Sequence, residues 1–204
     1  MKIGPKYKIA RRLGAAIFEK TQSPKYALSL ARKERTGVRS KGRVKPKSEF
    51  GLQLMEKQKA RFSYGLGEKQ FRNYVEKALR TEAPVQKLFT LLETRLDNVL
   101  YRSGLAKTRA QARQAASHGH TMVNGKRVTV PSILVSAGDV VSLRPGSATS
   151  PLFGEAIERM KTITAPIWLT VDAEKREATV AGVPVYVPGE QVFDLGVVIE
   201  FYNR

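Results

Sequence analysis

Residues 91–143 constrain the fold more than any other part of this sequence. They begin with two short helical patterns, continue through a turn-forming Asn124-Gly125 pair, and end in apolar runs that meet Gly138-Asp139. An Asn-Gly pair between alternating apolar residues is typical of a β-hairpin with a two-residue turn. The sequence therefore predicts a small module at residues 91–146, in which two helices pack on a short and mainly antiparallel sheet.

The charge of the chain is strongly positive and unevenly distributed. Lys and Arg number 36 against 18 acidic residues, which gives a formal net charge of +18. Residues 1–82 carry a net +15, residues 83–146 a net +6, and residues 147–204 a net −3. Such an excess is typical of a protein with a polyanionic partner. We expect the first two thirds of the chain to hold that partner, and the acidic tail to pack inward or face a protein.

The segments around the module carry recognisable helix and strand signals. Helices are expected after the capping residue Ser48, over residues 68–80, from Pro84 to residue 103, and from the capping residue Thr108 to Gly119. In the tail, residues 146–151 resemble a linker, residues 152–163 predict a helix, and alternating runs predict short strands at 167–172, 178–183 and 197–202. Residues 32–47 contain eight basic residues and one acid, which predicts an arm that becomes ordered on a partner. A solvated linker is the alternative.

The sequence offers no recognisable catalytic or metal site. It contains no Cys, which excludes disulfides and Cys-based zinc sites. His118 and His120 lack an apparent third ligand, so we interpret His118 as a polar helix-end residue that contacts RNA or water. Asp97 stands close to Arg95 and is interpreted as a member of an ion pair rather than a catalytic acid. We expect no enzyme activity, no cofactor and no bound metal.

No segment predicts contact with a membrane. No apolar run approaches the roughly 20 residues that a membrane span needs. The first residues lack the apolar core of a secretory signal, so we expect a cytoplasmic protein.

Basic side chains near the start of the second helix of the module form the main binding candidate. Lys107, Thr108, Arg109 and Arg113 occupy the start and outer face of that helix. Helix N-terminal N–H groups attract phosphate, and an Arg side chain can donate two hydrogen bonds to phosphate oxygens. Arg95 and Lys126 would extend this face. Folded RNA suits such a surface, because proteins recognise A-form RNA through its shape, phosphates and 2′-hydroxyls.

Several motifs resemble one known family. Within the module, RLDNVLYRSG, TRAQARQAASHG, MVNGK and GDVVSL resemble the RNA-binding module of the small-subunit ribosomal protein S-four family. GPKYKIARR, GLQLMEKQKARFSYGLGEKQFRNYV, PIWLTVD and VIEFYNR extend the resemblance to the bacterial type, in the family order and over most of the chain. The resemblance implies an α+β fold with a basic N-terminal arm (1–47) and a mostly helical first domain (48–90 plus 147–204), into which the module (91–146) is inserted.

The resemblance also implies a function. A family member is a structural constituent of the small ribosomal subunit, binds the 5′ domain of 16S rRNA early at a junction of several helices, and nucleates assembly. It also contributes to the mRNA entry channel and to translational accuracy, and it contacts neighbouring proteins, notably protein five. The mRNA-entry candidates are Arg43, Lys45 and Lys47. The rRNA-binding candidates are Lys6, Lys8, Arg11, Arg12, Lys57, Lys59, Arg61, Tyr64, Gln70, Arg72, Asn73, Arg95, Lys107, Thr108, Arg109, Arg113, Gln114, His118, Asn124 and Lys126.

One departure from the family and three alternatives accompany this interpretation. Many members bind zinc through an N-terminal Cys cluster, so in this Cys-free chain we expect rRNA to hold the arm instead. The module also occurs in pseudouridine synthases and certain tRNA synthetases, which makes an RNA-modifying enzyme the first alternative. A catalytic domain would need about 150 residues or more, whereas 57 follow Ser147. The second alternative is a regulatory binder of mRNA or DNA. The third, a basic membrane-surface protein, lacks an uncommitted amphipathic helix.

Overall fold

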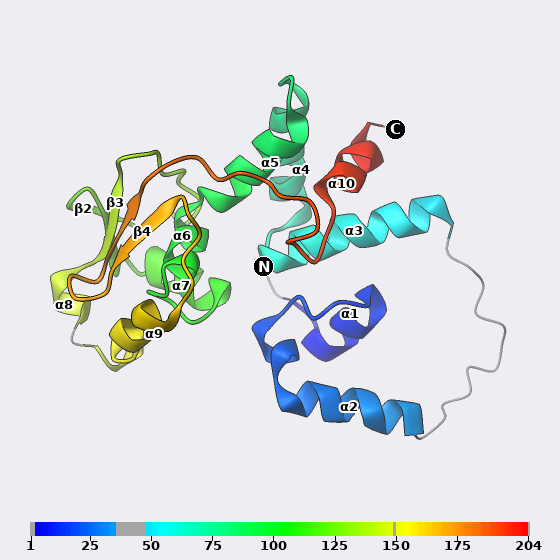
Figure 1. Cartoon of the computed structure of the whole chain (residues 1–204), viewed down its shortest axis with the longest axis horizontal. Coiled ribbons are helices and arrows are strands. Elements are labelled where there is room, and N and C mark those ends of the chain that lie inside the picture. Colours follow the sequence, from blue (N-terminus) through cyan, green and yellow to red (C-terminus); the bar gives the residue numbers. More distant parts are fainter. Residues whose placement is uncertain (1–2, 36–47, 149, 204) are drawn as a thin grey trace. The chain divides into compact units, whose positions relative to one another are not determined.

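A computed structural model describes residues 3–35, 48–148 and 150–203 of the chain (Figure 1). It divides into two compact units, one formed by Met1–Val85 with Val187–Arg204 and the other by Gln86–Tyr186. Helices predominate in the first unit, while the second combines helices with a five-stranded sheet. The predicted α+β class is confirmed.

The N-terminal part of the first unit is helical where the sequence predicted an arm. Helices α1 (Lys6–Leu13), η1 (Glu19–Gln22) and α2 (Pro24–Arg35) occupy the described part of residues 1–47. The apolar residues of this segment form a small core: Ala10, Leu13, Ile17, Phe18 and Tyr26. Met55 and Phe62 of the next helix pack against this core. The predicted arm therefore does not begin at the N-terminus, because these residues supply enough apolar surface to fold. Residues 36–47 lie outside the described part.

Three helices form the rest of the first unit. The Ser48 hydroxyl accepts a hydrogen bond from the Gly51 N–H and caps α3 (Glu49–Ser63), as predicted. The second helix is α4 (Glu68–Leu79), which buries Phe71, Tyr74 and Val75 on one face. The last is α10 (Leu195–Tyr202), which packs on α3 (Figure 1).

Helix α10 corrects the strand prediction for residues 197–202. The run is rich in β-branched residues, which favours a strand, but a short apolar run does not distinguish the two structures by itself. The Asp194 carboxylate accepts a 2.7 Å hydrogen bond from the Gly196 N–H and caps a helix instead. Leu195, Val198 and Ile199 then bury one face at helical spacing.

The second unit begins with a helix that breaks where the sequence predicted continuity. Helices α5 (Pro84–Glu93) and α6 (Leu96–Arg102) replace the single predicted helix. Arg95 adopts an extended conformation between them and forms an isolated β-bridge with Leu134. The Leu96 and Asp97 N–H groups donate to the carbonyls of Ile133 and Pro131. These tertiary partners satisfy the N–H groups that an uninterrupted helix would have bonded internally.

The sheet of the second unit is larger than predicted. Its antiparallel strands lie in the order β2-β1-β3-β5-β4: β1 (Thr121–Val123), β2 (Lys126–Val128), β3 (Val140–Leu143), β4 (Leu169–Asp172) and β5 (Glu177–Val180). The predicted hairpin turn is present at Asn124-Gly125, where both residues have positive φ. Because β5 pairs with β3, residues 147–186 belong to the unit that contains the module rather than to the first domain.

Helices cover the sheet and complete one core. Helix α7 (Arg109–Ser117) packs against α6, and both contribute side chains to the core (Figure 1). Short helices α8 (Pro145–Ala148) and η2 (Pro151–Phe153) follow β3 and replace the predicted linker. Phe153 and α9 (Ala156–Thr162), within the helix predicted for 152–163, bury apolar residues in the same core as α6 and α7. This core fixes α6 and α7, and α7 carries the predicted binding residues Arg109, Arg113 and Gln114.

Candidate nucleic-acid interface

Helices α6 and α7 enclose a group of buried polar side chains at the predicted binding surface. The side chains of Glu93 and Asp97 are only 1% and 3% exposed, and we call these two the inner carboxylates. Asn98 is also buried, and its Nδ2 donates to Oε2 of Glu93 at 2.9 Å. Buried carboxylates are costly unless they are paired and hydrogen-bonded. Each inner carboxylate is therefore expected to hold cationic partners, and each does.

Asp97 contacts two arginines. The buried Arg95 donates from Nε and Nη2 to the two carboxylate oxygens at 2.9 and 2.7 Å, so the predicted ion pair is confirmed. Arg113 of α7 donates from Nε and Nη2 to Oδ2 at 2.9 and 2.7 Å. The Arg113 side chain is 29% exposed, whereas that of Arg95 is 2% exposed. Arg113 thus reaches the surface, while Arg95 braces Asp97 from the inside.

Glu93 and Asn98 hold two further arginines. Arg102 donates from Nε and Nη2 to the two oxygens of Glu93, each at 2.9 Å, and its side chain is 27% exposed. Arg109 donates from Nε to Oδ1 of Asn98 at 2.8 Å, and its guanidinium lies 4.4 Å from the centre of the Tyr101 ring. We call the three partly exposed residues Arg102, Arg109 and Arg113 the arginine cluster.

The start of α7 lies beside this cluster in the sequence. The Thr108 hydroxyl accepts a 3.1 Å hydrogen bond from the Gln111 N–H and caps the helix, as predicted. The side chain of Gln111 in turn accepts from the Lys107 N–H at 2.7 Å. Lys107, Gln114 and His118 are exposed on or next to α7. A capped helix start flanked by cations presents a positive end to solvent.

The hairpin contributes less to this surface than expected. Lys126 is exposed, but Asn124 is occupied within the fold. Its Nδ2 donates to Asp139 at 2.7 Å, and its Oδ1 accepts from the Val140 N–H at 2.9 Å. Asn124 therefore ties the turn between β1 and β2 to the start of β3.

The two histidines are separate from any group of potential metal ligands in the described residues. Their rings lie 6.0 Å apart, and Nδ1 of His120 is 2.9 Å from the Ser147 hydroxyl. Within the described ranges, no group of three or more His, Asp and Glu side chains is placed to hold a metal. No helix in those ranges is long and apolar enough to span a membrane.

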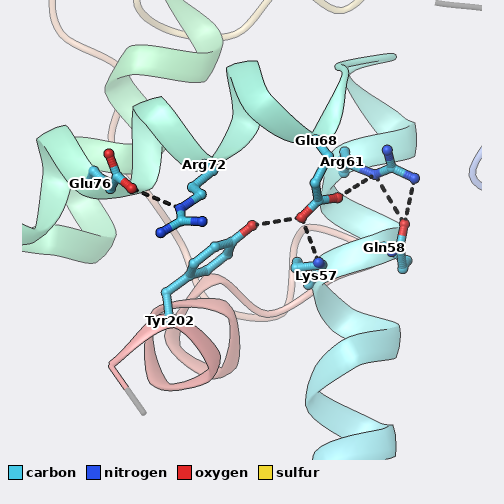
Figure 2. Close-up of polar contacts among 7 residues, drawn as sticks. All are labelled: Lys57, Gln58, Arg61, Glu68, Arg72, Glu76 and Tyr202. Carbon is cyan, nitrogen blue, oxygen red and sulfur yellow. Dashed lines mark hydrogen bonds and ion pairs between the residues drawn. The ribbon is translucent and has the colours of Figure 1, made fainter.

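In the first unit, two predicted binding residues, Lys57 and Arg61, contact the carboxylate of Glu68 (Figure 2). Lys57 Nζ lies 2.6 Å from Oε1 of Glu68, and its side chain is 9% exposed. Arg61 Nε lies 3.4 Å from Oε2 of Glu68, and it also donates to Gln58. The hydroxyl of Tyr202 in α10 donates to Oε1 of Glu68 at 3.1 Å. We call Lys57, Arg61, Glu68 and Tyr202 the Glu68 network.

Electrostatic coupling changes two pKa values in this network. Burial by itself raises the pKa of Glu68. Hydrogen bonds from Lys57 and Tyr202 and the positive charges of Lys57 and Arg61 together lower it by more than burial raises it, so the pKa of Glu68 lies below its ordinary value. Burial raises the pKa of Tyr202, and the negative charge and hydrogen bond of Glu68 raise it again. Glu68 is thus ionised and Tyr202 protonated at neutral pH, which keeps α3, α4 and α10 connected.

The other candidates of the first unit differ in exposure. Lys59 pairs with Glu56 at 2.6 Å, and Tyr64 is buried with its ring 5.9 Å from that of Phe193. Arg72 pairs with Glu76 and is exposed, as is Asn73, while Gln70 is half-buried. On α1, Lys8 and Arg12 are exposed and Lys6 and Arg11 are half-buried. The mRNA-entry candidates Arg43, Lys45 and Lys47 lie outside the described residues.

Sequence reasoning missed two basic residues of the second unit. Arg102 belongs to the arginine cluster, but its partner Glu93 lies nine positions away in the preceding helix, so the spacing of the two residues gave no signal. Arg127 is exposed on β2 and donates to the His118 carbonyl at 3.4 Å. Its guanidinium packs so closely on Gly119 that a Cβ there would lie 2.3 Å from Nε, and Gly119 also has φ of +71°. That approach joins two distant residues, so the spacing in the sequence gives no signal for it.

Comparison with known proteins identifies the family. Residues 1–94 match the family described as ribosomal protein S4/S9 N-terminal domain, and residues 94–141 match the S4 domain. The chain is 43% identical to small ribosomal subunit protein uS4 of Streptococcus mutans, over 98% of this chain and 97% of that protein. It is 45% identical to uS4 of Streptococcus thermophilus, with the same coverage, and 39% identical to uS4 of Chlorobium phaeovibrioides, over 97% and 96%. The chain therefore belongs to the family of small ribosomal subunit protein uS4.

Proposed function

We propose that this chain binds the 5′ domain of 16S rRNA at a junction of several RNA helices and fixes their relative orientation during assembly of the small ribosomal subunit. The observation that carries this proposal is the arginine cluster, whose guanidinium groups are ordered at the surface of α6 and α7. Arginine forks match the geometry of phosphate oxygens, and A-form RNA presents phosphates rather than base edges. The uS4 family consists of ribosomal constituents rather than enzymes.

The binding energy would come largely from the release of counterions. Positive side chains that neutralise Z phosphates give a slope of log K against log salt of about −0.7Z to −0.9Z. Residues 1–146 carry the whole positive excess of the chain, so they would supply most of these contacts. The exposed candidates are the first contacts to expect: Lys8, Arg12, Arg72, Asn73, Lys107, Gln114, His118, Asn124 and Lys126.

Other proposed contacts concern mRNA and neighbouring proteins. Arg43, Lys45 and Lys47 belong to the most basic segment of the chain and are proposed to meet mRNA at the entry channel, with a contribution to translational accuracy. The acidic tail is proposed to face neighbouring small-subunit proteins, notably protein five. The chain would act on ribosomes in the cytoplasm.

An RNA-modifying enzyme anchored by the module finds little support in the fold. Such an enzyme needs a catalytic domain beside the anchor. Residues 150–186, which could have begun one, instead supply β4, β5 and α9 to the sheet and core that contain the module. A regulatory role on mRNA remains compatible with the ribosomal one, since both use the same basic surface.

A binding titration with transcribed 5′-domain RNA tests the proposal. Binding of the full chain should be tight at low salt and should weaken steeply as salt rises, because phosphate contacts dominate. An unrelated structured RNA of equal length is the control for selectivity. A flat salt response, or equal affinity for both RNAs, would contradict the proposal. In a cell lysate, the protein should sediment with small subunits.

A further inference from the structure

We propose that Glu93, Asp97 and Asn98 are positioning residues that order the arginine cluster for phosphate before RNA arrives, and that Arg102 is a further RNA-binding residue within this cluster. This inference rests on the rRNA-binding function proposed above. It concerns three buried residues that would not touch RNA themselves, and one surface residue that the sequence did not single out.

The burial of the inner carboxylates makes their contacts persistent. Glu93 and Asp97 are almost fully enclosed, whereas their surface partners Arg102 and Arg113 are 27% and 29% exposed. Removing one partner from a buried ion pair leaves a charge without compensation, which is strongly unfavourable. Asp97 and Glu93 therefore hold Arg113 and Arg102 in place in the free protein as well as in a complex.

Holding an arginine in place changes what RNA binding costs. A free surface arginine samples many rotamers and loses that freedom when it binds a phosphate. In the arginine cluster, hydrogen bonds to Glu93, Asn98 and Asp97 fix the Nε edge of all three guanidinium groups before any RNA is present. A guanidinium carries five N–H donors in a planar array, so an arginine held through its inner edge can also donate outward.

The inner carboxylates do not cancel the positive charge of this region. Arg95, Arg102, Arg109 and Arg113 supply four guanidinium groups against the two inner carboxylates. A surplus of two positive charges remains at α6 and α7. The two acids and Arg95 lie inside, whereas Arg102, Arg109 and Arg113 reach the surface, so an approaching phosphate meets these three cations first.

A continuous chain of hydrogen bonds links Arg102 to the predicted binding residue Arg109. Glu93 accepts from both Arg102 and Asn98, and Asn98 accepts from Arg109 through its other amide atom. Arg102 and Arg109 are thereby linked through two buried side chains. An RNA backbone that reaches Arg109 therefore also comes within reach of Arg102.

The direction in which one substitution changes RNA affinity distinguishes a positioning role from a general effect of net charge. Asp97→Asn removes a negative charge, and a general increase in positive charge should strengthen the binding of a polyanion. The positioning role predicts the opposite, a loss of about tenfold or more in affinity for 5′-domain RNA, because the Arg113 contact depends on the Asp97 charge. Glu155→Gln is the matched control, since it also removes an acid from an Arg–carboxylate pair, and Glu155 is exposed at the start of α9. The control should bind as the unchanged protein does, or slightly better.

The salt dependence supplies a measurement that a merely structural role would not change. Loss of an ordered phosphate contact should reduce the magnitude of the log K against log salt slope by about 0.7–0.9. A smaller folded fraction would lower the apparent affinity and leave that slope unchanged. Arg102→Gln should reduce both affinity and slope, whereas Arg144→Gln, at an exposed arginine after β3, should reduce neither by a comparable amount.

A second pair of variants decides the matter if Asp97→Asn does not fold. Arg113→Lys keeps the charge but cannot form the two-donor contact with Asp97. It should lose about tenfold in RNA affinity, whereas Arg144→Lys should lose almost none. If the unchanged protein fails to bind 5′-domain RNA, the proposed function is wrong. If it binds and Arg113→Lys or Asp97→Asn binds as well as its control, the function stands and the positioning role is wrong.

Discussion

The arginine cluster and the Glu68 network both depend on pairs of a cation and a carboxylate, but in the two regions opposite members of the pair are buried. In the second unit, the carboxylates of Glu93 and Asp97 are buried, and the arginines that they hold reach the surface. In the first unit, the cation Lys57 is buried, and the carboxylate of Glu68 is half-exposed. A carboxylate core directs positive charge outward, whereas a buried lysine directs negative charge outward. The first arrangement suits phosphate, and the second suits the joining of helices.

This difference separates two kinds of basic residue that the sequence treats alike. Lys57 packs its ammonium 4.9 Å from the centre of the Phe201 ring and serves the contact between α3 and α10. Arg113 serves α6 and α7 but also faces solvent. We therefore expect substitutions in the arginine cluster to change RNA affinity, and substitutions in the Glu68 network to change stability.

The largest effect should come from Arg109→Ala combined with Arg113→Ala. RNA binding should weaken by about 3 kcal/mol, because each charged hydrogen bond contributes about 1.5–3 kcal/mol before screening. Filter binding to 5′-domain RNA measures this loss. Arg144→Ala combined with Lys161→Ala removes two exposed positive charges from the same unit and serves as the control. Equal binding by the two double variants, both folded by circular dichroism, would remove the arginine cluster from the interface.

Lys57→Met should produce the converse result. The Met side chain keeps part of the packing on Phe201 and Tyr202 but loses the contact with Glu68. We expect a loss of about 1–2 kcal/mol in unfolding free energy, within the usual range for a partly buried polar substitution. Denaturant unfolding measures this loss of unfolding free energy, and Lys77→Met, at an exposed position of α4, is the control. If Lys57→Met is as stable as the unchanged protein and loses as much RNA affinity as the arginine double variant, the proposed difference in function between the two regions is wrong.

Asn124→Ala tests whether the hairpin belongs to the binding surface or to the scaffold. Its side chain makes two hydrogen bonds inside the fold, and its backbone has φ of +50°. Because Asn tolerates this conformation better than Ala, the variant should lose about 1–2 kcal/mol of stability. Thermal unfolding checks this expectation, and Asn124→Asp, which keeps the acceptor for the Val140 N–H but places a second carboxylate beside Asp139, should lose at least as much. If stability is unchanged and RNA binding is weaker, Asn124 contacts RNA rather than supporting the fold.

The smallest effect concerns the pH dependence of the Glu68 network. The pKa of Glu68 in the folded protein lies below its ordinary value of 4.5. Its contribution to stability is therefore fully present above that ordinary value and is lost as the pH falls through the lower folded pKa. The difference in Tm between the unchanged protein and Glu68→Gln should narrow as the pH is lowered from 7 towards 3. A difference that grows over this interval would contradict the lowered pKa.

Local signals in the sequence predicted many elements correctly. Ser48 and Thr108 cap their helices through side-chain hydrogen bonds to nearby N–H groups, and such contacts depend on a few consecutive residues. Asn124-Gly125 forms the predicted turn for the same reason. The Arg95–Asp97 ion pair was also predictable, because the two residues are only two positions apart.

Features that depend on distant partners were not predictable in this way. The apolar run in α10 became a helix, capped by Asp194 and packed on α3, which precedes it by more than a hundred residues. Helix α5 ended before Arg95 because residues 131–134 supplied alternative partners for the backbone. The sheet gained β4 and β5 because β5 pairs with β3, although three helices and β4 lie between them in the sequence.

By itself, the sequence determined the positive charge, the capped helices, the hairpin turn and membership of the uS4 family, since these follow from composition or from neighbouring residues. Only the tertiary structure decided which cations face outward. Lys57 and Arg95 became buried, while Arg102 and Arg113 became ordered at the surface by Glu93 and Asp97. The physical reason is that a charged group is placed by what it packs against, and residues far apart in the chain supply those partners.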